Sequence, residues 1–460
     1  MIHRKSWDSI HHSIKLTPSQ SYLKLPSNPT PQTTHQRPQK RPPKPREPHP
    51  FLTQLKQTAD PDAALHLFNH HENMGFSHDY PSYSSLIYKL ARARRFDAVD
   101  RLLDRIRDAD IRCGETLFIA LIKHYGKSNS PDDAVDLFHR MPTFNCTRTL
   151  QSFNSLLDVL FQSGCLSDAV NFFRRSSELG FRPNSVSFNI VINGYCKAGI
   201  FDDACKMFDE MLERGVQPSV ITYNILIGFL CKKHELDKAM ELLQDIFRKG
   251  KYPNAVTYAL LMGGLCSMGK YTVAKKMMFD MEYRGCKPRP VNFGVLMSDR
   301  GKRGKIEEMR ELLAEMKRRR YKPDIVTYNI LMNYLCVEGR AVEAYKVLVE
   351  MQLEGCEPNA ATYRMMVDGF CRVGEFERAL RVLSAMLVSG HCPLTQTFSS
   401  LVVGLCEGGK VSDAYLVLEE MVKRKIGLDL AGWGGLVRAV CDGDGGCVGL
   451  VGELAIMDSE

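Results

Sequence analysis

A segment of 35 residues repeats along most of this 460-residue chain. The strings SFNIVINGYCK (187–197), TYNILIGFLCK (222–232) and TYNILMNYLCV (327–337) lie 35 and 105 residues apart, and both separations are multiples of 35. A period this regular predicts an array of repeats, each of which packs on its neighbours. Eleven frames reach residue 429 without insertion or deletion, and they begin at residues 45, 80, 115, 150, 185, 220, 255, 290, 325, 360 and 395.

The first half of a frame predicts a helix with one apolar face. Its fourth, seventh, eighth, eleventh and twelfth residues are mostly apolar, a spacing that matches the helical period. A Gly usually follows at the fifteenth residue, as at Gly199, where a left-handed backbone ends the helix. In the frame that begins at residue 220, the apolar positions are Tyr223, Leu226, Ile227, Leu230 and Cys231.

The second half of a frame predicts a second helix. Acidic residues such as Asp202 and Asp203 suit its N-terminus. The twentieth residue is Ala in nine of eleven frames, the twenty-seventh is Met in seven, and a Pro next to the frame's end in seven blocks continuation of the helix. Neither helix can bury its apolar face alone. We therefore expect an all-α solenoid with one long concave groove.

Residues 1–50 differ in composition from the rest of the chain. They carry +7 of the net charge of +8 and ten of the 22 prolines, which predicts disorder. The opening MIHRKSWDSIHHSIKL has basic residues and loosely spaced apolar residues, as in an organelle transit peptide, with a plain basic tail as the alternative. The following QRPQKRPPKPREPHP is interpreted as a stiff spacer, or alternatively as a ligand for a proline-binding module.

The composition of residues 51–460 narrows the function classes. Their net charge of +1 excludes a uniformly cationic nucleic-acid binder, so any contact with a polyanion must use locally placed charges. The 15 cysteines are an odd number in a long chain without an apolar signal-peptide core, which favours a reducing compartment. No apolar run approaches the roughly 18 residues that span a bilayer, so we expect no membrane insertion.

The repeated pattern V-x-Y-N-x-L-I-x-G-x-C-K-x-G, followed by Ala, Met, Gly and Pro-Asp or Pro-Asn, resembles the pentatricopeptide repeat family. The tetratricopeptide unit is one residue shorter, at about 34, and has an early Trp, whereas Trp7 and Trp433 lie outside all eleven frames. The uniform step resembles the P-type subgroup. The resemblance implies a right-handed superhelical α-solenoid with a degenerate first repeat at 45–79, ten tandem repeats over 80–429, and a partial capping helix and tail at 430–460.

The resemblance also implies binding of single-stranded RNA, with one base per repeat. In this family the fifth and last residues of a unit face the base edge, and the second residue packs against the base face. The implied pyrimidine pairs are Asn154 with Asn184, Asn224 with Asn254, and Asn329 with Asn359; Asn189 with Ser219 favours cytosine, and Ser399 with Asp429 a purine. The implied stacking residues are Val186, Ile221, Val256, Val291 and Val326.

Several frames depart from the family pattern at the fifth and last residues. Ser84 with Gly114 is ambiguous, and four pairs give no base preference, so these units are expected only to space the strand. The implied target is 5′-NN-Y-C-Y-NN-Y-N-R-3′. The four pairs without a preference are Ile119 with Thr149, Ala259 with Arg289, Gly294 with Asp324, and Arg364 with Leu394.

The thirteenth residue is basic in six of the ten frames from residue 80 onward. A column of cations at the ends of the first helices predicts phosphate contacts, with complementing of the helix dipole as the alternative. These residues are Arg92, Lys127, Lys197, Lys232, Lys302 and Arg372.

Other chemistry-bearing residues are interpreted as structural, and no metal or cofactor is expected. Cysteines recur at the twelfth position without any Cys-x-x-Cys, which favours small buried thiols over a zinc site. His70, His71 and Glu72 lack the Pro-Cys-x-x-Cys of zinc deaminases and are assigned to a surface helix. The basic run 317–320 is expected to be solvated, and the acidic residues of CDGDGG at 441–446 to lie in a frayed tail.

The sequence thus predicts an RNA-binding protein of an organelle, the mitochondrion before the chloroplast, which acts sterically and without catalysis. Single-stranded organelle RNA is the expected partner, together with proteins of RNA processing, splicing or translation. A protein-binding scaffold that uses the same groove is the competing hypothesis, and a metal-dependent RNase is a distant third.

Overall fold

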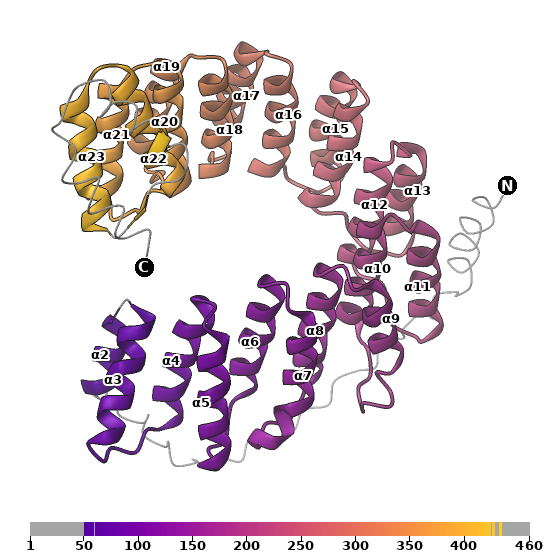
Figure 1. Ribbon diagram of the computed structural model, residues 1–460. Helices are drawn as coiled ribbons and strands as arrows, with labels where there is room; N and C mark the ends of the chain where they lie inside the picture. The colour runs from indigo at the N-terminus through magenta and orange to yellow at the C-terminus, as the bar shows by residue number, and fades with distance from the viewer. Residues whose placement is uncertain (1–49, 59, 425, 428–431, 435–460) are drawn as a thin grey trace, which may run out of the picture. The chain divides into compact units, whose positions relative to one another are not determined.

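The computed structural model describes residues 50–58, 60–424, 426–427 and 432–434 (Figure 1). These residues form helices, turns and loops without a strand, so the predicted all-α class is confirmed. From residue 80 onward, every frame opens with its first helix. The first helices are α2 (Pro50–Gln57), α4 (Tyr80–Arg92), α6 (Glu115–Lys127), α8 (Leu150–Gln162), α10 (Ser185–Ala198), α12 (Val220–Lys232), α14 (Ala255–Ser267), α16 (Pro290–Lys302), α18 (Ile325–Val337), α20 (Ala360–Arg372) and α22 (Thr395–Glu407).

A second helix follows each first helix after a short turn. The second helices are α3 (Pro61–Asn73), α5 (Phe96–Asp108), α7 (Pro131–Arg140) with the 3-10 turn η1 (Met141–Phe144), α9 (Leu166–Arg174), α11 (Phe201–Glu213), α13 (Leu236–Arg248), α15 (Tyr271–Tyr283), α17 (Ile306–Arg318), α19 (Ala341–Leu353), α21 (Phe376–Val388) and α23 (Val411–Lys423).

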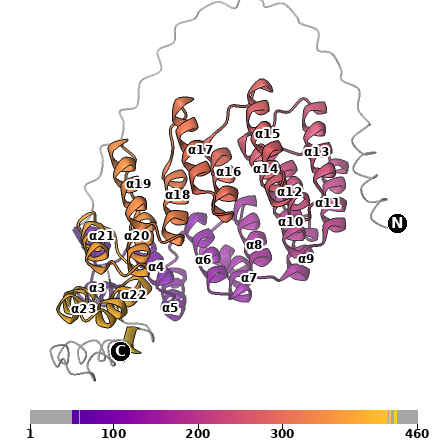
Figure 2. The same ribbon diagram turned by 90° about the horizontal axis from the view of Figure 1, so that it is seen from above.

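The described residues divide into two compact units, which meet in sequence at Phe229 and Leu230. Within each unit the first helices lie side by side in one layer and the second helices form another (Figures 1 and 2). Neighbouring first helices such as α6 and α8, or α16 and α18, pack directly on one another. Each unit therefore presents a continuous row of first helices, which we call the first-helix face.

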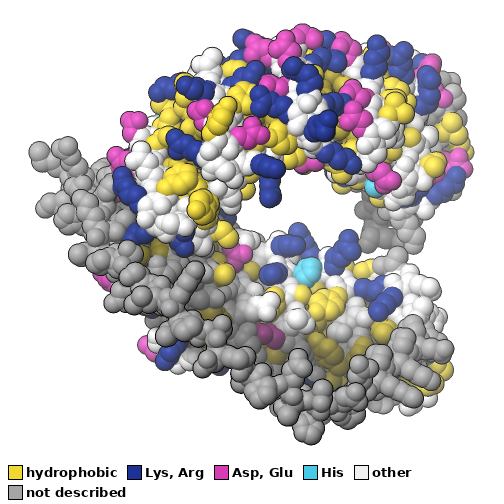
Figure 3. All heavy atoms as spheres, turned by 180° about the vertical axis from the view of Figure 1, so that it is seen from behind, with side chains coloured by type: hydrophobic (Ala, Val, Ile, Leu, Met, Phe, Trp, Pro, Cys, Tyr) yellow, Lys and Arg dark blue, Asp and Glu magenta, His cyan; other side chains and the backbone are white. Residues whose placement is uncertain are grey.

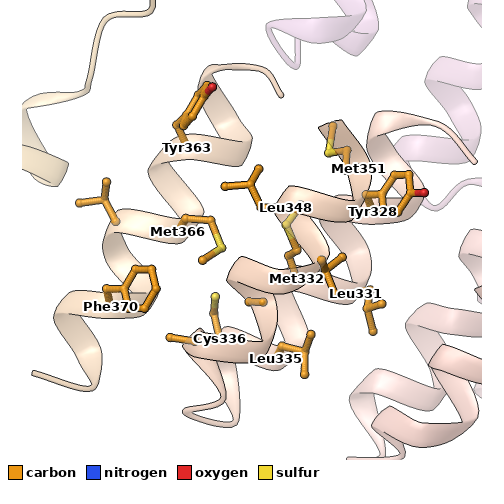
Figure 4. Packing of buried hydrophobic residues seen from close by; sticks show 14 of the residues in the cluster. Tyr328, Leu331, Met332, Leu335, Cys336, Leu348, Met351, Tyr363, Met366 and Phe370 are labelled. Atoms are coloured by element: carbon orange, nitrogen blue, oxygen red, sulfur yellow. The ribbon is translucent and has the colours of Figure 1, made fainter. Parts of the chain in front are cut away.

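Small and flexible side chains fill the space between the layers. All nine alanines at the twentieth frame position, for example Ala204 and Ala344, are completely buried. All seven methionines at the twenty-seventh position, for example Met351, are completely buried as well. Figure 4 shows how Leu331 and Leu335 of α18, Leu348 and Met351 of α19, and Met366 and Phe370 of α20 gather into one cluster. Because each helix pair shares its core with the next pair, the repeats fold as an array.

The turn between paired helices takes the left-handed backbone that the sequence predicts at the fifteenth position. Gly199 has φ 81° there. Arg94, Asn129 and His234 occupy the same frame position in other repeats and also have positive φ, near 60°. The stacking of the repeats thus imposes this backbone even where no glycine relieves it.

Two neighbouring glycines of α14 allow a matched test of helix packing. A Cβ on Gly264 would lie 2.9 Å from Cβ and Sγ of Cys231, whereas a Cβ on Gly263 would meet only Cγ1 of Val295 at 4.0 Å. We expect Gly264→Ala to lower the free energy of unfolding by about 1–3 kcal/mol because of overpacking. Gly263→Ala should raise it by up to about 1 kcal/mol, since Ala favours the helix. Urea unfolding measures both, and equal effects of the two substitutions would contradict the close approach of the helices.

Candidate nucleic-acid interface

Apolar side chains at the second frame position are exposed to solvent on the first-helix face. Val186 and Ile221 are 51% and 61% exposed, and Val256, Val291 and Val326 are 49%, 45% and 63% exposed. The two residues that follow each of them in sequence are buried, for example Thr327 and Tyr328. These five side chains lie in the first turns of their helices and do not pack in the core. They are therefore available to pack against a flat ligand.

The asparagines of the first predicted pair are linked by a hydroxyl of the next repeat. Asn184 is the N-cap of α10, and its Oδ1 accepts hydrogen bonds from the backbone N–H groups of Val186 (3.0 Å) and Ser187 (3.1 Å). The Ser187 Oγ accepts the Asn184 backbone N–H (3.2 Å) and donates to Asn154 Oδ1 (2.7 Å). The last residue of one frame and the fifth residue of the same frame are therefore held together through the third residue of the next frame.

The same arrangement recurs in the second unit. Asn359 is the N-cap of α20, and its Oδ1 accepts the backbone N–H of Thr362 (3.0 Å). The Thr362 Oγ1 donates to Asn329 Oδ1 (2.8 Å) and lies 3.1 Å from Asn359 Oδ1. Since the hydroxyl holds the carbonyl oxygens, the Nδ2 donors of Asn154 and Asn329 remain for a ligand edge.

The pair Asn189 and Ser219 differs from these. The Thr222 Oγ1 accepts the Ser219 backbone N–H (3.0 Å) and lies 3.3 Å from Ser219 Oγ. Asn189 Oδ1 is buried and has no hydrogen-bond partner among the described residues. A buried acceptor without a donor costs about 1–3 kcal/mol. The Asn189 amide therefore gives up fewer hydrogen bonds within the protein than the amides of Asn154 and Asn329 when it turns toward a ligand.

The frames without a base preference have different contacts at these positions. At the fifth position Ile119 and Ala259 are buried, and Gly294 has no side chain. At the last position, Thr149 already donates two hydrogen bonds within the protein. Glu115 Oε1 accepts its backbone N–H and its hydroxyl, each at 2.8 Å. Ser399 of the predicted purine pair is buried too, and Asp429 lies outside the described residues.

The six basic residues at the thirteenth position are all exposed at the ends of first helices. Among the described residues, no ion pair involves any of them. Burial lowers the pKa of His124, and the positive charges of Lys127 and Arg92 lower it further. Cations from two successive repeats therefore contribute to the electrostatic potential at one place, around His124. On the face that Figure 3 shows, Lys and Arg side chains form separate clusters rather than one continuous patch.

A hollow of about 800 Å³ opens on the first-helix face of the second unit. Val291 and Val326 of successive repeats line it, with Gly294 between them and Lys302 at the helix end. A Cβ added to Gly294 would meet only Ile330 Cδ1, at 3.2 Å. The frame of Gly294, one of the four without a base preference, therefore has an open space between two exposed valines and beside Lys302, which has no ion pair with a described residue.

Comparison with known sequence families identifies the repeat. A family described as the PPR repeat family matches five overlapping stretches, and two families described as the PPR repeat match five more. These stretches are 148–197, 183–232, 218–267, 289–337 and 323–372 for the first, and 81–111, 116–146, 256–286, 361–391 and 389–422 for the others. The chain belongs to the pentatricopeptide repeat family.

Two curated pentatricopeptide repeat-containing proteins of Arabidopsis thaliana, both named as mitochondrial, are similar to this chain. One is 56% identical over 121 residues, which are 26% of this chain and 26% of the relative. The other is 37% identical over 120 residues, which are 25% of this chain and 22% of the relative. The chain thus spans about a quarter of the length of these relatives.

Solved structures of pentatricopeptide repeat proteins are similar to the chain as well. The protein PPR10 from maize is 21% identical, with a TM-score of 0.43 over 89% of this chain and 69% of that chain. PPR10 in complex with an 18-nt psaJ RNA element is 18% identical, with a TM-score of 0.34 over 89% of this chain and 84% of that chain.

The polar residue at the third frame position was not predicted as part of the site. It is Ser, Thr or Asn in nine of the ten pentatricopeptide repeats from residue 80, with Leu117 as the exception. Ser187 and Thr362 show its role, since each completes the capping box of its helix and also donates a hydrogen bond to the asparagine of the preceding first helix. The signal was present in the sequence, because an N-cap residue followed three positions later by a hydrogen-bonding side chain is the spacing of a capping box.

Within the described part of the chain, no three or more His, Cys, Asp or Glu side chains come together as they would to hold a metal ion. Burial raises the pKa of Cys336 to about 11 and that of Cys371 to about 12, so both thiols stay protonated at neutral pH. Cys441 and the CDGDGG acids lie outside the described residues. None of the described helices is long and apolar enough to cross a membrane.

The expectation of a solvated basic run at 317–320 holds for Arg318, Arg319 and Arg320, which are exposed, but fails at Lys317. Lys317 is not solvated, because its ammonium group bonds to Glu350 and to Glu354 of the next repeat and lies 5.5 Å from the Tyr328 ring. The sequence could not predict these contacts, because the partners lie 33 and 37 residues away.

The bridging hydroxyl can be tested by its removal. We expect Thr362→Val to lower the free energy of unfolding by about 1–3 kcal/mol, because it leaves the Asn359 N–H and Asn329 Oδ1 without their partner. The matched control is Thr397→Val, at the same buried position but without a described side-chain hydrogen bond, which should change it by less than about 0.5 kcal/mol. Urea unfolding followed by circular dichroism makes the comparison. Equal losses would contradict the bridge.

The hydrogen bonds to the Glu115 carboxylate should make the free energy of unfolding depend on pH. Burial raises its pKa, but hydrogen bonds from Ser152 and Thr149 outweigh burial and hold the pKa below the ordinary 4.5. A lowered carboxyl pKa stabilises the fold above the unfolded pKa, and this stabilisation is lost as the pH falls through the folded value.

We therefore expect Glu115→Gln to be less stable than the natural protein at pH 7, with the difference shrinking below about pH 4. Thermal unfolding between pH 3 and 7 checks this. The control Glu213→Gln changes an exposed carboxylate at the end of α11 and should have no comparable effect. A stability difference between Glu115→Gln and the natural protein that stays constant with pH would contradict the lowered pKa of Glu115.

Proposed function

We propose that this chain binds single-stranded RNA along the first-helix face of its repeats, one base per repeat, and acts sterically in an organelle. The observation that carries the proposal is the linked amide pair. Ser187 and Thr362 fix the asparagines of two repeats in the same geometry, each beside an exposed apolar side chain. A ligand that repeats along its length with flat apolar faces and polar edges matches this arrangement.

The distribution of charge supports a polyanionic ligand. Six cations lie at equivalent helix ends, and none is in an ion pair with a described residue. They supply local positive charge although residues 51–460 carry a net charge of only +1. If all six contact phosphates, the logarithm of the affinity should fall with the logarithm of salt concentration with a slope of about −4.

We further propose that the chain acts in the mitochondrion, with the chloroplast as the alternative. The two curated relatives named as mitochondrial support this localisation. Transcript stabilisation, processing, splicing and translation are the outcomes that steric binding can produce, and no catalytic step is assigned to the chain. The buried fifth residues Ile119 and Ala259 favour a second candidate, a protein-binding scaffold in which only some repeats read bases.

The test is selection of the purified chain against a randomised single-stranded RNA pool at two salt concentrations. We expect enrichment of a Y-C-Y core, which Asn154, Asn189 and Asn224 with their last-position partners would read. The substitutions Asn189→Ala, Asn224→Ala and Asn329→Ala together should weaken binding of the selected RNA by at least about a hundredfold, because three lost base contacts cost about 1–3 kcal/mol each.

The control carries Asn73→Ala and Asn171→Ala, which change two exposed asparagines of second helices and should retain full affinity. Lys197→Gln with Lys232→Gln should reduce the salt slope by about 1.4, or about 0.7 for each phosphate contact. Binding that is indifferent to the three reading asparagines would favour the protein-binding scaffold.

A further inference from the structure

Helix α19 is apolar on both of its faces. Its inner face packs into the core through residues such as Ala344, Val347 and Met351. On the opposite face, apolar side chains follow each other at intervals of three and four residues and remain in solvent. This exposed strip consists of Val342 (40% exposed), Tyr345 (45%), Val349 (38%) and Leu353 (83%).

The strip is not a general feature of the second helices. In the preceding repeat, α17 has charged residues at three of the four equivalent positions. Those residues are Glu307, Arg310 and Arg318, in place of Val342, Tyr345 and Leu353. Since the core of each repeat is complete without them, these apolar side chains contribute little to folding. A contiguous exposed apolar surface of this kind typically marks an interaction site.

A small pocket lies at one end of the strip, between α19 and α21. It has a volume of about 260 Å³. Apolar and aromatic side chains form part of its wall, with the Phe370 ring 6.1 Å from that of Tyr345. The remaining lining residues are the cations Lys346, Arg378 and Arg381. One bulky apolar side chain of a partner can enter this pocket.

The charges around the strip favour an acidic partner. The carboxylates of α19 already have partners, because Glu343 pairs with Arg340 and Arg310, and Glu350 pairs with Lys317. Lys346 and Arg381 are exposed and form no ion pair within 4.0 Å of a described carboxylate, although their charges act on Glu343 and Glu377, which have closer ion-pair partners. Arg381 makes only a hydrogen bond of 3.5 Å to the backbone carbonyl of Glu377. The rim of the pocket therefore keeps an excess of positive charge.

We propose that the outer face of α19 and α21 binds an acidic amphipathic helix of a partner protein. Its apolar residues lie along Val342, Tyr345, Val349 and Leu353, and its carboxylates face Lys346 and Arg381. Aliphatic side chains spaced along a helix match the i, i+3, i+7 anchors of helix recognition better than they match an RNA backbone. The site lies on the second-helix layer, so it leaves the first-helix face free, and it does not rest on the proposed RNA function.

The test uses the full chain and two fluorescein-labelled synthetic helices of about 18 residues, or five turns. Both carry leucines at the spacing of the strip, and their flanking residues are glutamates in one and lysines in the other. We expect the glutamate helix to bind about tenfold more tightly than the lysine helix in fluorescence anisotropy. Equal binding of the two helices, or binding of neither, would overturn the proposal.

Two surface variants assign the binding to this site. Val342→Ser with Tyr345→Ser should weaken binding of the glutamate helix by about tenfold. Lys346→Glu with Arg381→Glu should reverse the preference, so that the lysine helix binds more tightly. The control Val273→Ser with Tyr283→Ser removes two exposed apolar side chains of α15 and should retain the affinity.

Two other occupants would each overturn the proposal. Sedimentation of the natural chain as a dimer that Val342→Ser with Tyr345→Ser dissociates would identify the face as a contact between copies. A loss of single-stranded RNA affinity in Lys346→Glu with Arg381→Glu, without any change in peptide preference, would identify it as an RNA surface.

Discussion

The structure depends on the burial of apolar faces that no single repeat can bury alone. Most helix pairs are closed by an alanine at the twentieth position, a methionine at the twenty-seventh, or both, and these residues are completely buried wherever they occur. An alanine lets the helix axes approach, and a methionine adapts its shape to the gap that remains. The glycines of the first helices, such as Gly264 against Cys231, extend this close approach from one repeat to the next.

Helix capping links this packing to the candidate interface. The last residue of a frame caps the next first helix, so Asn184 and Asn359 satisfy backbone donors that would otherwise be orphaned. The hydroxyl that completes each capping box also holds the asparagine of the preceding helix. The side chains proposed to read bases are therefore structural as well. A substitution at these positions must be judged by stability and binding together.

Much of the fold follows from local sequence patterns. The 35-residue period, the apolar spacing and the left-handed fifteenth position all concern residues within one frame, where helical geometry relates sequence to space directly. The second-position side chains were named through the family resemblance, and helical geometry accounts for their exposure, since the helix that buries Tyr328 turns Val326 outward. The capping role of the third-position hydroxyls is local and could have been predicted, whereas their link to the preceding repeat could not, because Asn154 lies 33 residues from Ser187.

The sequence by itself determined the repeat, its helices and the residues that face away from the core. The tertiary structure alone decided which polar groups meet across repeats. It placed Thr362 between two asparagines, left Asn189 Oδ1 without a donor among the described residues, paired Lys317 with carboxylates of the next repeat, and opened a hollow beside Gly294. The physical reason is that burial depends on the period of one helix, whereas hydrogen bonds and ion pairs depend on distances of about 3 Å between separate helices, which a pattern along one chain does not specify.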